Sequence, residues 1–178
     1  MKTQIGTPVM KQFWEAKKAH PNSIMLFRMG DFYETFEDDA IQTSEILGIA
    51  LTKRANGAAA KVPLAGFPYH ALDQYLHKLL KAGHRVAICE QVEDPKLAKG
   101  IVKREVMEVL SPGTALSDKY LDQKENNYLC AVTLDKRKCG ISILDHSTGE
   151  FSTCSRDHED LLSLLKQFHV SEVIIPED

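Results

Sequence analysis

The chain has 178 residues, of which 43% are hydrophobic, and its formal net charge is −3. This length holds one domain, or one domain and part of a second, with enough apolar residues for a buried core. The charge excludes a nucleic-acid binder dominated by basic residues. There is no apolar stretch of 18 residues and no apolar secretory run at the start, so we expect a soluble, cytoplasmic protein without a membrane partner.

Charge is distributed unevenly along the chain. Residues 1–110 carry 15 Lys and Arg against 13 Asp and Glu, whereas residues 111–178 carry 7 against 12. A nucleic-acid-binding surface is therefore expected in the first part only, as a local basic patch.

The first 48 residues predict two helices with a strand between them. A helix is expected over residues 7–19, with a proline in its first turn, and a strand over residues 23–29. A second helix, capped by Asp38 or Asp39, should end at Gly48, because acids favour helix starts and glycine favours helix ends.

The segment Gly30-Asp31-Phe32-Tyr33-Glu34 lies between that strand and the second helix. In an extended chain Phe32 and Glu34 point to one face, about 7 Å apart, and Tyr33 points to the other. Gly30 allows another backbone or a ligand to approach closely. An aromatic ring beside an acid suits wedging between stacked bases and hydrogen bonding to one of them, while ordinary strand packing is the alternative.

The rest of the first part alternates between strands and helices, which predicts a mixed α/β domain with a mixed sheet flanked by helices. A loop of small residues is expected over residues 55–61, since it contains no large apolar side chain. The elements expected after it are a strand and turn, a helix and two strands, over residues 63–72, 71–82, 84–92 and 103–113.

The last third predicts three strands in a meander, then a helix and a fourth strand. The strands are expected at residues 127–134, 139–145 and 150–155, the helix at 157–168 and the last strand at 171–178. Polar residues without a clear period precede them and suggest a linker. The expected division is a first domain, a linker and the start of a second domain, at residues 1–112, 113–125 and 126–178.

Five sequence blocks, FRMGDFYETFEDDA, LTKR, PLAGFPYHAL, VAICEQVEDP and VLSPGT, follow one another over most of residues 25–114. In this order they closely resemble the amino-terminal region of the bacterial MutS family of DNA mismatch-repair proteins. The resemblance implies a mismatch-recognition domain followed by the first part of a ribonuclease H-like connector domain. It also implies that the chain is a fragment of a longer protein.

The resemblance implies roles for particular residues. In the family the Phe-x-Glu pair reads the mismatch, so Phe32 is expected to stack on a mispaired or unpaired base from the minor groove and Glu34 to hydrogen bond to it. Residues expected to contact DNA near this pair are Met29, Gly30, Lys53, Arg54 and Lys61. A second basic stretch that could contact phosphates consists of Lys96, Lys99, Lys103 and Arg104.

The resemblance also implies partners and a nucleoid-associated location in the cytoplasm. The expected ligand is double-stranded DNA with mismatches or small insertion/deletion loops, and the parent protein is expected to be a homodimer that acts with a MutL-type repair protein. The family's ATPase, with its ATP and Mg²⁺, lies in the carboxy-terminal part, so this fragment is expected to have no catalytic residue, no metal and no cofactor. The alternative function is a structural or protein-interaction domain without mismatch specificity.

Two kinds of catalytic site are alternatives to these expectations. Clustered acids could hold Mg²⁺ in a nuclease, and a first-strand aspartate could serve a ribonuclease H site. Helix-start and turn positions explain the same acids without a metal. The acids concerned are Asp31, Glu34, Glu37, Asp38 and Asp39 in the first case, and Asp135 or Asp145 in the second.

Histidines and cysteines do not predict a metal site. His70, His77 and His84 recur every seven residues, but seven helical residues span roughly 10 Å, which is too far for two imidazoles to share a metal. The four cysteines contain no Cys-x-x-Cys pair and are expected to be reduced thiols, most of them in the core: Cys89, Cys130, Cys139 and Cys154.

Overall fold

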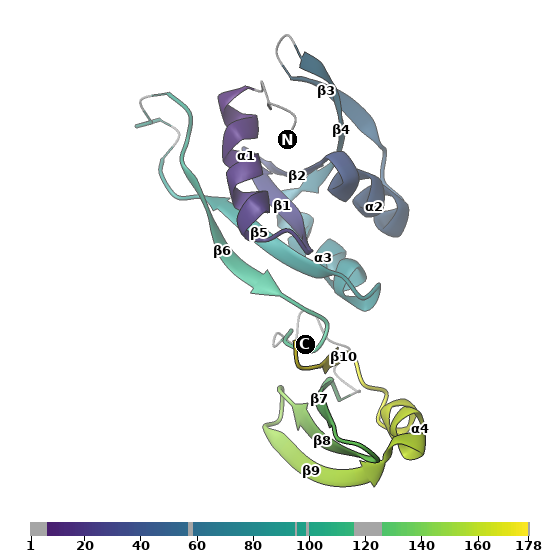
Figure 1. Cartoon of the computed structure of the whole chain (residues 1–178). Helices are drawn as coiled ribbons and strands as arrows, with labels where there is room; N and C mark the ends of the chain where they lie inside the picture. Colours follow the sequence, from purple (N-terminus) through teal and green to yellow (C-terminus); the bar gives the residue numbers. More distant parts are fainter. Residues whose placement is uncertain (1–6, 57–58, 95, 99, 116–125, 178) are drawn as a thin grey trace. The chain divides into compact units, whose positions relative to one another are not determined.

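The structure, a computed structural model, describes residues 7–56, 59–94, 96–98, 100–115 and 126–177. It divides into two compact units, residues 1–110 and 111–178 (Figure 1), and each is described by itself. Within the described ranges, every helix is too short or too polar to span a bilayer.

The first unit is a six-stranded mixed sheet with three α-helices, which confirms the fold class expected from the sequence. The strand order is β3-β4-β2-β1-β5-β6, and β1 pairs with β5 in parallel while all other pairs are antiparallel. The helices are α1 (Pro8–Ala19), α2 (Glu37–Leu47) and α3 (Leu72–Lys81), with a 3-10 turn, η1 (Tyr69–Ala71), before α3. The strands are β1 (Ser23–Met29), β2 (Phe32–Phe36), β3 (Thr52–Asn56), β4 (Ala59–Pro68), β5 (Arg85–Gln91) and β6 (Arg104–Leu110).

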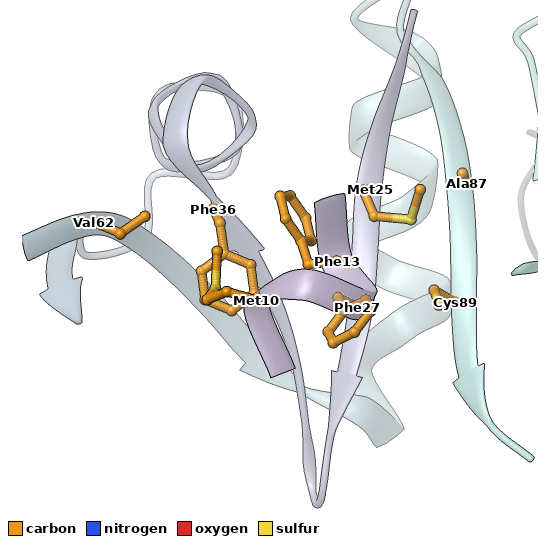
Figure 2. Close-up of a cluster of buried hydrophobic side chains, with 8 residues drawn as sticks. All are labelled: Met10, Phe13, Met25, Phe27, Phe36, Val62, Ala87 and Cys89. Atoms are coloured by element: carbon orange, nitrogen blue, oxygen red, sulfur yellow. The ribbon is translucent and has the colours of Figure 1, made fainter. Parts of the chain in front are cut away.

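One face of this sheet is covered by α1. Phe13 of α1 makes edge-on ring contacts with Phe36 of β2 and Phe27 of β1, at centroid distances of 4.9 and 5.7 Å. Such aromatic pairs contribute about 0.5–1.5 kcal/mol beyond their buried area. Figure 2 shows the whole cluster, which gathers side chains from one helix and four strands: Met10, Phe13, Met25, Phe27, Phe36, Val62, Ala87 and Cys89.

The opposite face packs against α3. Phe67 of β4 lies between two tyrosine rings, with centroid distances of 5.9 Å to Tyr33 of β2 and 4.6 Å to Tyr75 of α3. Leu76 and Leu79 of α3 are fully buried. Both faces of the central strands are therefore covered, which explains why β1 is almost continuously apolar.

The start of α2 differs from the expected capping. The helix begins at Glu37, so Asp38 and Asp39 lie in its first turn and neither is the cap residue. Asp39 is buried, and its carboxylate accepts hydrogen bonds from the Met25 backbone N–H at 3.0 Å and from the Lys17 ammonium at 2.7 Å. Asp39 therefore joins α2 to β1 and α1. The expected end at Gly48 is confirmed, because Gly48 has a φ of +67°.

The loop expected over residues 55–61 was wrong for most of its length. β3 continues to Asn56 and β4 begins at Ala59, with Asn56 opposite Ala59 in a hairpin. Gly57 and Ala58 lie outside the described residues. Small residues do not by themselves favour a strand. Here the extended conformation is stabilised by backbone hydrogen bonds to the neighbouring strand.

The second unit is a four-stranded sheet in the order β10-β7-β8-β9, with β10 parallel to β7 and the other pairs antiparallel. Its core contains Cys130, Val132, Cys139, Ile141 and Ile143. All four cysteines of the chain are free thiols. The elements are β7 (Tyr128–Leu134), β8 (Lys138–Asp145), β9 (Glu150–Asp157), a 3-10 turn η2 (His158–Asp160), α4 (Leu161–Gln167) and β10 (Glu172–Ile174).

The order of elements in this unit agrees with the expected strand-strand-strand-helix-strand sequence, although α4 and β10 are shorter than expected. Most of the expected linker, residues 116–125, lies outside the described residues. Ser111, Thr114 and Ala115, which lie beside it in the chain, form a hydrogen-bonded turn that belongs to the second unit.

Candidate nucleic-acid interface

The Gly30–Asp31 turn joins β1 to β2 as a two-residue hairpin loop, since Met29 pairs directly with Phe32. Gly30 has a φ of +61°, as the first central residue of a type II′ turn requires. The sequence had suggested that glycine allows a close approach here. A Cβ atom at Gly30 would meet nothing within 4 Å, so the need for glycine comes from the backbone conformation.

Phe32 begins β2 directly after this turn, and 46% of its surface is exposed. The expected alternation of faces is present: Tyr33 and Thr35 are buried on the α3 side, whereas Phe32 and Glu34 lie on the α1 side with Phe36. A large ring exposed at the end of a well-packed strand is thus presented to solvent on a rigid support.

Glu34 forms an ion pair with Arg54 of β3, with 2.6 Å between the carboxylate Oε2 and the guanidinium Nη1. The side chains are 19% and 38% exposed, respectively. Glu34 reaches Arg54 across β4, where its cross-strand neighbour is Gly66. A Cβ atom at Gly66 would lie 2.9 Å from the Tyr33 carbonyl oxygen and 3.4 Å from Glu34 Cγ.

Burial raises the pKa of Glu34 above its ordinary value, and the nearby charges of Arg54 and Arg104 act against this increase. The carboxyl group is therefore easier to protonate than an exposed glutamate, even with a cation beside it. It can serve as a hydrogen-bond acceptor when ionised and as a donor when protonated.

Arg104 belongs to the second basic stretch that was expected to contact phosphates, but its side chain lies half-buried against the sheet. Its Nε donates to the Arg28 carbonyl oxygen at 2.6 Å, and its guanidinium lies 5.1 Å from the centroid of the Phe27 ring. Its charge also lowers the pKa of Glu34. Arg104 therefore supports the site from within the sheet.

The other two basic candidates, Lys53 and Lys61, lie on the face of the sheet opposite Arg54. Lys53 pairs with Pro63 and so points to the face opposite Arg54, and its side chain is exposed. Lys61 is exposed and lies next to Val62, which faces the α1 side. The adjacent residues Lys53 and Arg54 therefore do not act as one patch, because neighbouring strand residues alternate between faces.

Two further expectations concern Met29 and the second basic stretch. Met29 is half-buried and packs against the α1-side cluster, directly opposite Phe32 in the hairpin. Lys103 forms an ion pair with Glu105 at 2.5 Å, and Lys96 is exposed. Lys99 lies outside the described residues.

Several acids of the metal hypotheses have structural partners. Asp39 anchors α2 as described above. The Asp145 carboxylate accepts hydrogen bonds from the backbone and side chain of Ser147, which stabilise the β8–β9 turn. Burial acts to raise the pKa of Asp145, but hydrogen bonds from Ser147 and Thr148 together hold it below its ordinary value. Asp135 accepts a hydrogen bond from the Lys136 backbone in a turn. Among the residues that the structure describes, no three His, Cys, Asp or Glu side chains are placed to hold one metal ion.

The sequence did not identify Gly66 or Arg28 as parts of this region, and it placed Arg104 in a separate basic stretch. For Gly66 a signal existed, because an isolated glycine inside a strand pattern often marks a close approach of another group. The cross-strand position of Arg104 depends on the register of β5 with β6, which includes an irregularity at Ile88 and Cys89. A single sequence does not predict such a register.

Comparison with known proteins gives two family matches and many similar proteins. MutS domain I matches residues 7–119 and MutS domain II matches residues 127–178. Proteins named DNA mismatch repair protein MutS are 57% identical over 168 residues in Phocaeicola vulgatus and 53% identical over 174 residues in Porphyromonas gingivalis. These alignments cover 94% and 98% of this chain, but only 19% and 20% of the relatives, so the chain spans about a fifth of their length. This chain belongs to the MutS family.

Proposed function

We propose that the first unit recognises mismatched or unpaired bases in duplex DNA, for DNA mismatch repair. In this proposal residues 1–112 are the mismatch-recognition domain, 113–125 a linker and 126–178 the amino-terminal part of a connector domain. Phe32 inserts from the minor groove and stacks on the affected base, and Glu34 hydrogen bonds to that base. The family membership supports this reading, because MutS domain I covers the whole region around both residues.

The exposure of Phe32 is the observation that carries the proposal. Nearly half of this ring is open to solvent at a tight turn, while the strand behind it is buried. Unstacking a base step costs a few kcal/mol, and a mismatch has already lost part of that stacking. A ring on a rigid support can therefore distinguish a deformable step from an intact one.

Glu34 must exchange partners to act on a base. Its Oε2 is bonded to Arg54. When DNA approaches, phosphates offer Arg54 an alternative anion, which releases the carboxyl group for a base N–H. The pKa of Glu34 is already raised, and the negative field of the phosphates raises it further, so a carboxyl group that becomes protonated can instead donate a hydrogen bond to a base acceptor.

The acid also disfavours intact duplex. A carboxylate near phosphates is repelled, so Glu34 weakens binding wherever no base hydrogen bond compensates. We expect E34A to reduce discrimination between mismatched and matched DNA while raising affinity for matched DNA.

The proposal also extends to the activities of the whole, longer protein. The whole protein is proposed to be an ATP-dependent mismatch sensor that binds ATP and Mg²⁺ outside these residues, acts as a homodimer in the cytoplasm and passes its signal to a MutL-type protein. No residue of this chain is given a catalytic role; its residues bind and orient DNA. Met29, Gly30, Lys53, Arg54 and Lys61 are the proposed additional DNA contacts.

A chimera provides the test: this chain replaces the matching segment of the Phocaeicola vulgatus relative. Fluorescence anisotropy measures its affinity for duplexes with an unpaired T, with a G·T mismatch and with full pairing, at one fixed salt concentration. We expect a preference for both defective duplexes in the chimera, and its loss in F32A.

Phe151 provides a matched control, because it is also an exposed phenylalanine but belongs to the second unit. F151A should keep the preference. Size-exclusion chromatography and circular dichroism confirm that each chimera is folded. A folded F32A chimera with unchanged preference would show that the ring is not the reader, and a folded chimera without any preference would favour a purely structural role for this chain.

A further inference from the structure

Arg28, near the end of β1, lies against the turn that carries Phe32. Its Nε donates a hydrogen bond to the Gly30 carbonyl oxygen. Its guanidinium carbon lies 3.9 Å from the centroid of the Tyr69 ring, which is the distance of direct stacking. One side chain thus joins the turn to the segment that follows β4.

Tyr69 also holds the turn through its backbone. Its N–H donates to the Asp31 carbonyl oxygen at 2.9 Å. The preceding residue, Pro68, is the cross-strand neighbour of Phe32. Both carbonyl groups of the two-residue turn are therefore bonded, one by the Arg28 side chain and the other by the Tyr69 backbone.

The position of Arg28 is itself fixed by contacts with neighbouring side chains. Its side chain is only 17% exposed, and its Nη1 lies 3.7 Å from the Glu90 carboxylate. The buried hydroxyl group of Tyr33 donates to the same carboxylate, and burial together with this bond raises the Tyr33 pKa. The guanidinium also lies 5.5 Å from the Tyr33 ring centroid. The Glu90 carboxylate and the rings of Tyr33 and Tyr69 thus leave the Arg28 guanidinium little freedom to move.

We propose that Arg28 and Tyr69 form a clamp that holds the Gly30–Asp31 turn in one conformation, and that Arg28 is a positioning residue for Phe32. This rests on the proposed function, since it explains how the wedge is kept rigid. If the turn is loose, the ring moves away from any stacked base step that it meets. It then cannot distinguish an intact base step from a defective one. A ring whose turn is already ordered does not have to be ordered on binding.

The chemistry of this contact requires arginine. The guanidinium group is planar, so it can stack on Tyr69 while its Nε donates in the same plane to Gly30. A lysine at this position keeps the charge near Glu90 but has neither the flat surface nor the Nε donor. R28K therefore removes the stacking and the Nε hydrogen bond of the clamp while it keeps the positive charge.

The first experiment measures the turn itself, by NMR on the 178-residue chain. We expect R28K to lower the heteronuclear ¹⁵N NOE of Gly30 and Asp31, and to speed hydrogen exchange of the Tyr69 amide by about tenfold, as local opening becomes easier. R85K is the matched control, because Arg85 is exposed at the other end of the sheet, opposite Ser23. It should change neither signal.

Variants at Tyr69 test the other half of the clamp. Y69F keeps the ring and should leave the turn ordered, whereas Y69L removes the stacking surface and should loosen it as R28K does. The exchange of the Leu26 amide, in the core of β1, shows whether a variant is globally unfolded. An ordered turn in both R28K and Y69L would overturn the clamp.

The second experiment measures discrimination in the chimera. R28K should reduce the ratio of mismatched to matched affinity by about threefold to tenfold, the effect expected when one side chain must be ordered on binding. In an F32A background R28K should lower mismatch affinity no further, because it acts through Phe32. An equal loss in both backgrounds, or a loosened turn with an unchanged ratio, would overturn the positioning role. If the unmutated chimera shows no preference, the proposed function fails, while the NMR result on the clamp still stands.

Discussion

Phe32 and Phe36 are the same residue type, on the same strand and on the same face of the sheet, but they have opposite environments. Phe36 is 1% exposed and packs edge-on against Phe13 of α1, whereas Phe32 is 46% exposed. The α1 helix covers one end of β2 and leaves the other end open. An aromatic ring on a strand is therefore a core residue or a surface probe according to what covers it.

The covered end supports the open end. The ring cluster around Phe36 fixes β2 to β1 and to α1, and the turn before Phe32 is bonded through both of its carbonyl groups. The exposed ring is therefore held by a strand that cannot easily shift. Mutations at the two ends should separate stability from recognition.

The largest expected effect is on stability at the covered end. F36A should lower the free energy of unfolding by about 3–5 kcal/mol, because it leaves a cavity among buried rings. F32A should lower it by about 1 kcal/mol at most, since nearly half of its ring is already in solvent. Urea unfolding followed by circular dichroism gives both values. Equal losses for the two variants would contradict the proposed division between support and probe.

Asp39 provides a second test of the covered end. D39A should cost about 2–3 kcal/mol, because it leaves the Met25 N–H without its acceptor and the Lys17 ammonium without its anion. Asp38 is the matched control, since it is exposed in the same first turn of α2, and D38A should cost less than about 1 kcal/mol. A D38A loss as large as that of D39A would show that helix-start electrostatics outweighs the buried contacts.

These residues also show what the sequence could and could not predict. Alternation at period two placed Phe32 and Glu34 on one face, and most helices and strands of the first unit followed from periodicity and from glycine and proline positions. The facing ends of β3 and β4 did not, because they consist of small residues. The pairing of Glu34 with Arg54 depends on the order of β2, β4 and β3 in the sheet, which adjacent sequence does not reveal. Asp39 looked like a cap because local pattern cannot show that a helix will bury its first turn.

Arg54 makes the open end sensitive to pH. Its charge lowers the Glu34 pKa, whereas burial raises it, so R54Q should raise the pKa of Glu34 further above its ordinary value. A carboxyl group with a raised pKa in the folded state stabilises the fold at low pH. That stability is lost as pH rises through the folded pKa, and R54Q should extend the loss to higher pH.

Two measurements check this prediction. A ¹³C NMR titration of the Glu34 side-chain carboxyl group reports its pKa directly in the unmutated chain and in R54Q. Urea unfolding as a function of pH reports the linked stability. The double variant E34Q/R54Q is the control and should lack this pH dependence. A lower Glu34 pKa in R54Q would show that the ion pair does not control this carboxyl group.

The smallest expected effects concern the salt dependence of DNA binding, and they separate two adjacent cations. Lys53 is exposed on the face opposite Arg54, and if it contacts a phosphate, K53Q should lower the slope of log affinity against log salt by about one. Arg54 is already paired with Glu34. If Arg54 binds a phosphate instead, it leaves an unpaired Glu34 carboxylate in the interface, and this negative charge offsets the positive charge that Arg54 contributes. R54Q should therefore change the slope less than K53Q does. The comparison is made in the chimera on matched duplex, where the mismatch contacts do not contribute. A larger slope change for R54Q than for K53Q would mean that the Glu34 carboxyl group is protonated in the complex, because only then does Arg54 bring a full uncompensated charge to the DNA.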